Sequence, residues 1–163
     1  MYGTYEKFLD IYGTTMSMDE HSRFAWEADR LIDRHTTGLD NVRKLRVAFP
    51  TDEYDVECVQ RCECALVYIL HRFEVTEKLA ASNAESTGGA VSGGVIKSVS
   101  SGSESIEYAT DSESASGTAI DAAAKDTAKR AALIARTVRD YLSGAQDVNG
   151  VNLLYMGVYP HVL

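Results

Sequence analysis

The chain has 163 residues, a formal net charge of −8 at pH 7 and a pI of about 4.9. Its length fits one domain with appendages, and its hydrophobic content of 45% is ordinary for a globular protein. The acidic balance argues against a surface built to hold DNA phosphates tightly, because such surfaces carry clustered Lys and Arg side chains.

The sequence also does not indicate a membrane protein or a disulfide-rich protein. Charged residues interrupt the first ten positions, unlike in a signal peptide, and the longest apolar run, residues 65–70, is too short to cross a bilayer. The three cysteines, Cys58, Cys62 and Cys64, are an odd number close together, so they do not predict a disulfide framework. We therefore expect a protein with no membrane partner that is made in a reducing cytoplasm.

The pattern near the N-terminus predicts two helices. The first covers residues 5–12, and the second begins after Ser17 and ends near His35. Ser17 and Glu20 have the spacing of a capping box, in which each side chain accepts a hydrogen bond from the backbone amide of the other. Residues 39–50 are predicted to connect these helices to the next one, with their basic side chains in solvent. These side chains are Arg43, Lys44 and Arg46.

The longest helix is predicted to follow Thr51 as its cap and to run to about Leu79. Apolar side chains recur at helical spacing along it, so we expect it to be the central and most buried element. Its predicted buried stripe consists of Cys58, Cys62, Ala65, Leu66, Ile69 and Phe73.

The composition changes sharply over residues 82–117, where Ser and Gly account for 17 of 36 positions. Such a segment buries too little apolar surface to form a core of its own. Within it, residues 95–99 and 105–108 alternate weakly between apolar and polar, which predicts a β-hairpin flanked by flexible arms.

The last predicted helix covers residues 119–142, and a polar spacer, residues 145–149, separates it from an apolar tail. Eight of the eleven residues from Leu153 to Leu163 are Leu, Tyr, Met or Val. An exposed apolar patch of this kind normally marks an interaction surface. The tail can fold back on its own domain or dock on a partner. The spacer favours docking, because it lets the tail reach away from the helix.

No pattern in the chain predicts a catalytic, cofactor or metal site. A zinc site needs about four converging ligands, usually as two separated pairs, and the cysteines have no second pair. Gly89 and Gly94 have the spacing of a phosphate-binding loop, but the Lys and the Ser or Thr that must follow are absent. The many serines lack a Gly-x-Ser-x-Gly elbow. We therefore expect no enzyme activity.

Three short stretches, taken with the order of the elements, carry a resemblance to a known family. They are residues 31–36 (Leu-Ile-Asp-Arg-His-Thr), 141–144 (Tyr-Leu-Ser-Gly) and 152–158 (Asn-Leu-Leu-Tyr-Met-Gly-Val). With a long central helix and a Gly/Ser-rich hairpin between them, the chain resembles the head–tail connector (adaptor) proteins of tailed bacteriophages and prophages.

The resemblance implies a mainly α fold. The expected architecture is a small bundle of three to four helices around a long central helix, with an inserted β-hairpin and an extended C-terminal arm. Residues 1–144 would form the helical adaptor domain, with the flexible insertion at 82–117, and residues 145–163 would form the docking arm.

The resemblance also implies a structural role in the virion neck, after assembly in the bacterial host cytoplasm. Copies of the chain would form a dodecameric ring beneath the portal protein and extend the DNA channel. The ring would present a platform for a stopper or tail-completion protein, and DNA would pass through without specific recognition.

Three sets of residues become site candidates under this resemblance. The portal-docking candidates are Leu153, Leu154, Tyr155, Met156, Val158 and Tyr159. The candidates on the hairpin, facing the lumen or a neighbouring subunit, are Val95, Ile96, Val99, Ile106 and Tyr108. A basic face between subunits would consist of Lys125, Lys129 and Arg136.

Three alternatives remain open. A stopper or tail-terminator protein would occupy the same neck, but those are usually β-rich. A helical nucleic-acid-binding protein of DNA packaging is disfavoured by the charge of −8. An enzyme of unrecognised type is the third, and no converging set of polar residues favours it.

Overall fold

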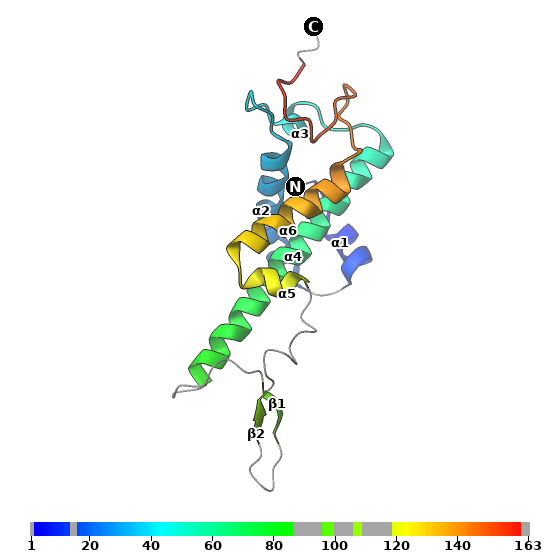
Figure 1. Ribbon diagram of the computed structural model, residues 1–163. Helices are drawn as coiled ribbons and strands as arrows, with labels where there is room; N and C mark the ends of the chain where they lie inside the picture. The colour runs from blue at the N-terminus through cyan, green and yellow to red at the C-terminus, as the bar shows by residue number, and fades with distance from the viewer. Residues whose placement is uncertain (1, 14–15, 87–95, 100–105, 109–118, 161–163) are drawn as a thin grey trace. The chain divides into compact units, whose positions relative to one another are not determined.

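The computed structural model describes residues 2–13, 16–86, 96–99, 106–108 and 119–160. The described part is mainly helical, as predicted (Figure 1). The chain divides into two compact units, one made of residues 1–71 and 131–163 and the other of residues 72–130. The predicted boundary at residue 144 does not coincide with this division, because the C-terminal residues belong to the first unit. No helix of the described part is both long and apolar enough to cross a membrane.

The first two helices begin and end as their capping residues dictate. Helix α1 covers Tyr5–Tyr12, and helix α2 covers Met18–Thr36. The predicted capping box is confirmed: the Ser17 hydroxyl accepts a hydrogen bond from the Glu20 amide, and the Glu20 carboxylate accepts one from the Ser17 amide at 3.0 Å. The two helices are therefore fixed locally, in agreement with the sequence pattern.

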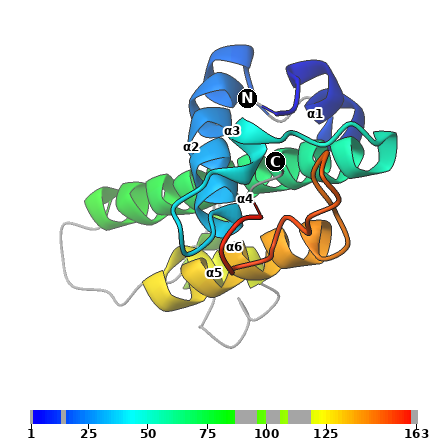
Figure 2. The same ribbon diagram turned by 90° about the horizontal axis from the view of Figure 1, so that it is seen from above.

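The long central helix, α4, covers Glu53–Ser86, so it runs further than predicted. Asp52 caps it in place of Thr51, because the Asp52 carboxylate accepts hydrogen bonds from the amides of Tyr54 at 2.9 Å and Asp55 at 3.3 Å. The predicted stripe is confirmed as buried except at Cys58, which is half-buried. Figure 2 shows α2 crossing over α4.

The predicted helix over residues 119–142 is interrupted. Helix α5 covers Ala119–Ala124 and helix α6 covers Thr127–Leu142. Asp126 separates them, because its carboxylate accepts hydrogen bonds from the amides of Ala128 at 2.8 Å and Lys129 at 3.1 Å. An acidic side chain that bonds the first amides of a helix acts as an N-cap, so the chain starts a new helix at this point.

Two short strands, β1 (Ile96–Val99) and β2 (Ile106–Tyr108), pair antiparallel with an irregular register. The residues between them, 100–105, and the candidate Val95 lie outside the described residues, and no strand side chain is described. Two short strands alone do not support the inserted hairpin, because the residues that would join them lie outside the described residues. The hairpin therefore stays a prediction.

Candidate interaction surface

Residues 143–160, which we call the C-terminal segment, form a folded loop. The amide of Leu153 donates a hydrogen bond to the carbonyl of Ala145 at 2.9 Å, which brings the two ends of a turn together. Inside the turn, the Asp147 carboxylate accepts hydrogen bonds from the amides of Asn149 at 2.8 Å and Val151 at 2.9 Å. Both Ala145 and Leu153 are buried. The polar spacer, residues 145–149, thus folds into a turn and does not act as a flexible linker.

The C-terminal segment packs against the connector between α2 and α4, which carries the single-turn helix α3 (Lys44–Val47). The Lys44 ammonium, fully buried, donates hydrogen bonds to the carbonyls of Leu153, at 3.1 Å, and Tyr155. The amide of Leu39 donates to the carbonyl of Met156 at 3.2 Å, and Asp40 accepts the amide of Tyr159 at 2.7 Å. Backbone and side-chain contacts therefore hold residues 153–159 of the segment against the connector.

The expectation that Lys44 lies in solvent is wrong, and its burial has a physical reason. A buried ammonium needs acceptors, and the irregular C-terminal segment offers carbonyl groups that no helix uses. Burial lowers the pKa of Lys44, while the nearby carboxylates of Asp147 and Asp40 raise it. Arg43 and Arg46 of the same connector are exposed, as expected.

The predicted extended C-terminal arm is corrected by these contacts. Leu153 and Tyr159 are buried, and the Tyr159 hydroxyl donates to the Asp147 carboxylate at 2.5 Å. Leu154 is half-buried. The tail folds back on its own domain because its apolar side chains and carbonyls find partners there. Leu153 and Tyr159 are therefore unavailable to a partner unless the segment is released.

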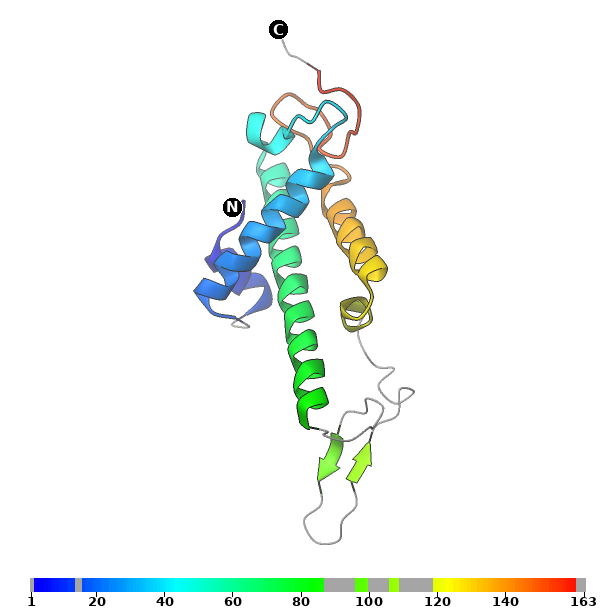
Figure 3. The same ribbon diagram turned by 90° about the vertical axis from the view of Figure 1, so that its left-hand side faces the viewer.

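The remaining docking candidates stay on the surface. Tyr155 is 49% exposed, Met156 53% and Val158 64%, and Leu39, which bonds the backbone of Met156, is 80% exposed. Figures 1 and 3 show the connector with α3 and the C-terminal segment meeting beyond the same end of α2. We call residues 37–50 and 143–160 the loop end. It presents apolar side chains that two separate segments hold in place.

The predicted basic face is exposed, and two of its members have acidic partners on their own helix turn. The ammonium of Lys129 lies 4.0 Å from the Asp126 carboxylate, and the guanidinium of Arg136 lies 3.5 Å from that of Asp140. Exposed pairs of this kind contribute little stability and leave the charges open to solvent. Lys125 is exposed as well.

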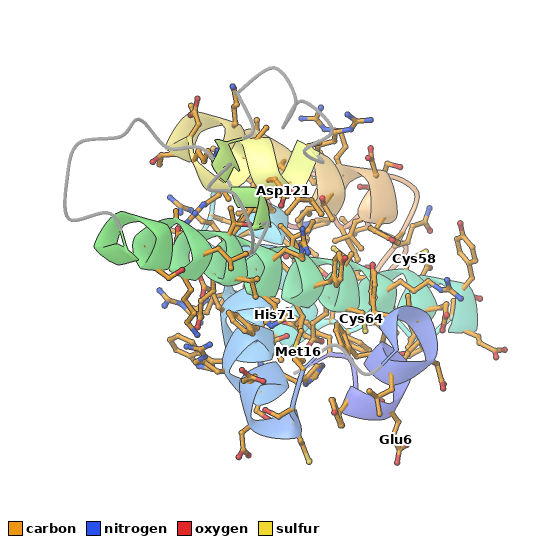
Figure 4. The ribbon with its side chains drawn as sticks, turned by 90° about the horizontal axis from the view of Figure 1, so that it is seen from below. Glu6, Met16, Cys58, Cys64, His71 and Asp121 are labelled. Carbon is orange, nitrogen blue, oxygen red and sulfur yellow. The ribbon has the colours of Figure 1, made fainter. Side chains whose placement is uncertain are left out.

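Cys62 and Cys64 are buried on α4, and Cys58 is half-buried. Figure 4 shows Cys58 and Cys64 along α4. Burial raises the pKa of the Cys62 thiol far above its usual range and that of Cys64 to about 11, so neither is a thiolate at neutral pH. Across the described part of the chain, no group of three or more His, Cys, Asp or Glu residues could hold a metal ion.

Two features were missed by sequence reasoning. Glu63 is a buried carboxylate on α4 that accepts hydrogen bonds from the amides of Tyr2, at 2.6 Å, and Gly3. Its place between Cys62 and Cys64 gave no warning, because charged residues are rarely buried. The second feature is a surface groove beside α2 with Trp26, the only tryptophan, at its rim. The spacing of Trp26, Arg30 and Arg34 by four residues was visible in the sequence and would have indicated it.

Comparison of the chain with models of known protein families, with curated protein sequences and with solved structures gave no match.

Proposed function

We propose that this chain is a head–tail connector of a tailed bacteriophage or prophage, which assembles as a ring beneath the portal protein and lengthens the DNA channel. The role is structural and needs no catalysis. The ring would carry a stopper or tail-completion protein on its other face, and DNA would pass through without sequence recognition.

The observation that carries this proposal is the exposed apolar loop end. Leu39, Val47, Met156 and Val158 of the loop end are all more than half exposed. Exposed apolar residues that gather at one place mark a protein–protein contact. Backbone hydrogen bonds and the buried Lys44 hold these residues in position, so a partner would meet a preformed surface.

The helical character of the described part supports the adaptor over its first rival. Stopper and tail-terminator proteins are usually β-rich, whereas six helices account for most of the described residues here. The overall charge of −8 supports it over a DNA-packaging protein, because tight binding to phosphates requires an excess of Lys and Arg.

A head-binding assay with surface variants tests the role of the loop end. Met156→Asp combined with Val158→Asp should abolish attachment to portal-bearing heads, because two charges would be buried without partners in the contact. Both side chains are exposed in the isolated chain, so the variant should keep the helical circular-dichroism spectrum and the unfolding midpoint of the wild type.

The matched control is Met18→Asp, which changes an exposed apolar side chain at the start of α2 to the same residue type. It should attach like the wild type. Deleting residues 152–163 is a weaker test, because the deletion also removes the buried Leu153 and the acceptors of Lys44. Undiminished attachment of the Met156/Val158 variant would remove the loop end from the portal contact.

A further inference from the structure

A groove of about 1030 Å³, open to solvent, lies between α2 and the connector in the first unit. Trp26, Arg30 and Arg34 line it from α2, and Arg43 and Arg46 line it from the connector. The guanidinium of Arg30 lies over the ring of Trp26, 4.7 Å from the ring centre. Trp26 is nevertheless 63% exposed. We call these five residues the Trp–Arg groove.

The positive charge of this groove is only partly used inside the chain. Arg46 forms an ion pair with Asp33 at 3.0 Å, and Glu27 also lines the groove. Arg34 and Arg43 are exposed and have no ion pair among the described residues. A tryptophan beside arginines is the composition that dominates protein–protein contacts, where both residue types carry much of the binding energy. The groove therefore suits an acidic segment that also offers an aromatic side chain.

The chain itself has such a segment at the start of α4. Asp52 and Glu53 are exposed, Asp55 is half-buried, and Tyr54 is 71% exposed. The carboxylates of these three acids form no ion pair within the described part of the chain. Figures 1 and 2 show α4 beginning on the side of the first unit away from α2. The acidic start of α4 is thus placed to meet the groove of another copy.

We propose that the Trp–Arg groove of one copy binds the acidic start of α4, residues 52–55, of a second copy. Opposite charges steer the two surfaces together, and Trp26 and Tyr54 supply apolar contact area. Because the two patches differ, the contact is heterologous, and repeated head-to-tail contacts close into a ring when the rotation between copies allows it. The inference rests on the proposed function, since it names the contact by which neighbouring subunits of the ring join.

A charge exchange between two variants of the full chain tests this contact. Arg34→Glu with Arg43→Glu makes the groove acidic, and Glu53→Arg with Asp55→Arg makes the start of α4 basic. Each variant alone should be a monomer of about 17.8 kDa by light scattering after gel filtration. An equimolar mixture should recover the assembly of the wild type, because each acidic groove then meets a basic helix start.

Recovery on mixing separates this contact from a general effect on folding, because two variants that had failed to fold would not assemble when mixed. Trp26→Ala should weaken self-association by about tenfold or more, as truncation of a central tryptophan does. The control variant Arg61→Glu with Lys78→Glu reverses two exposed charges on α4 that belong to no proposed contact, and it should associate like the wild type.

The possible results separate this inference from the proposed function. If the wild type is a monomer alone but joins portal-bearing heads, the same variants and their mixture are compared in the attachment assay. Association unchanged in the groove variant would overturn the inference and leave the proposed function standing, as would failure of the mixture to recover. Groove-dependent binding of a double-stranded DNA probe, without self-association, would assign the groove to nucleic acid and overturn the inference. A wild type that neither associates nor attaches to heads would overturn both.

Discussion

Glu63 and Lys44 are ionisable side chains that water does not reach, at 1% and 0% exposure. They hold the two ends of the first unit: Glu63 accepts hydrogen bonds from the amides of Tyr2 and Gly3, and Lys44 donates to carbonyls of the C-terminal segment. Burying a charge costs free energy unless it is paired, so the pKa of each group depends on the charges that surround it. Lys44 has carboxylates nearby, whereas Glu63 has another buried acid, Asp29.

The pKa of Glu63 makes stability depend on pH. Burial, with a smaller contribution from Asp29, raises this pKa from 4.5 to about 7, although the two backbone amides oppose the change. Between these values the folded chain keeps a proton that the unfolded chain has released. Stability is therefore highest below about pH 4.5 as far as Glu63 is concerned, falls as the pH rises towards 7, and levels off above it.

We predict that Glu63→Gln removes this dependence, because the amide cannot titrate and still offers an oxygen to the Tyr2 and Gly3 amides. Urea unfolding at pH 5 and pH 8 should show the wild type losing about 2–3 kcal/mol relative to the variant. Glu53→Gln, at an exposed position, should follow the wild type across the range. If the free energies of unfolding of the wild type and Glu63→Gln changed in parallel with pH, the pKa of Glu63 would be the same in the folded and unfolded chains, which would contradict this prediction.

The sequence contains the capping box of α2 in readable form but not these buried charges. Ser17 and Glu20 act through the local backbone, so their spacing alone predicted the capping box. The burial of Lys44 depends on residues more than a hundred positions away in the sequence, which no local pattern reports. For the same reason the sequence pattern identified the apolar tail but wrongly predicted that Leu153 is exposed for docking, whereas it is buried.

At the scale of elements, the C-terminal segment is held by a close approach of two backbones. A Cβ atom placed on Gly38 would lie 2.5 Å from the carbonyl oxygen of Gly157, closer than real side chains come to a neighbour. Only glycine at position 38 lets the end of α2 and the segment approach in this way. The packing of the C-terminal segment thus depends on the absence of a side chain at Gly38, which is distant in the sequence.

We predict that Gly38→Ala pushes the segment away from the connector. Overpacking of this kind costs about 1–3 kcal/mol, and the displaced segment should become a preferred site of proteolysis. Urea unfolding and limited proteolysis with mass detection of the cut sites measure the two effects. Gly144→Ala is the control, because nothing lies within 4 Å of a Cβ there. Equal cleavage of the two variants between residues 145 and 160 would contradict the docked position.

The interruption between α5 and α6 shows where helical periodicity misled. The spacing of apolar residues over residues 119–142 fits one helix, but Asp126 bonds the amides that follow it and begins a second helix. Asp is a poor residue inside a helix and a good one at its start, so Asp126 carried the signal that the period obscured.

At the scale of the whole molecule, the proposal gives two tasks to neighbouring surfaces of the first unit, which share the connector. The loop end would meet the portal through exposed apolar side chains, and the Trp–Arg groove would join neighbouring copies through charge. The net charge of −8 fits a channel wall along which DNA slides, because an acidic surface does not retain phosphates. The resemblance in the sequence suggested only the portal contact, whereas the groove is a feature of the structure, and the exposed residues supply positions at which to test both.

Negative-stain imaging of the full chain mixed with purified portal protein tests the central claim most directly. We predict closed rings of the chain seated on one face of the portal, with subunits related by rotation about its axis. A chain that remains a separate particle of about 17.8 kDa beside an unchanged portal would contradict the account.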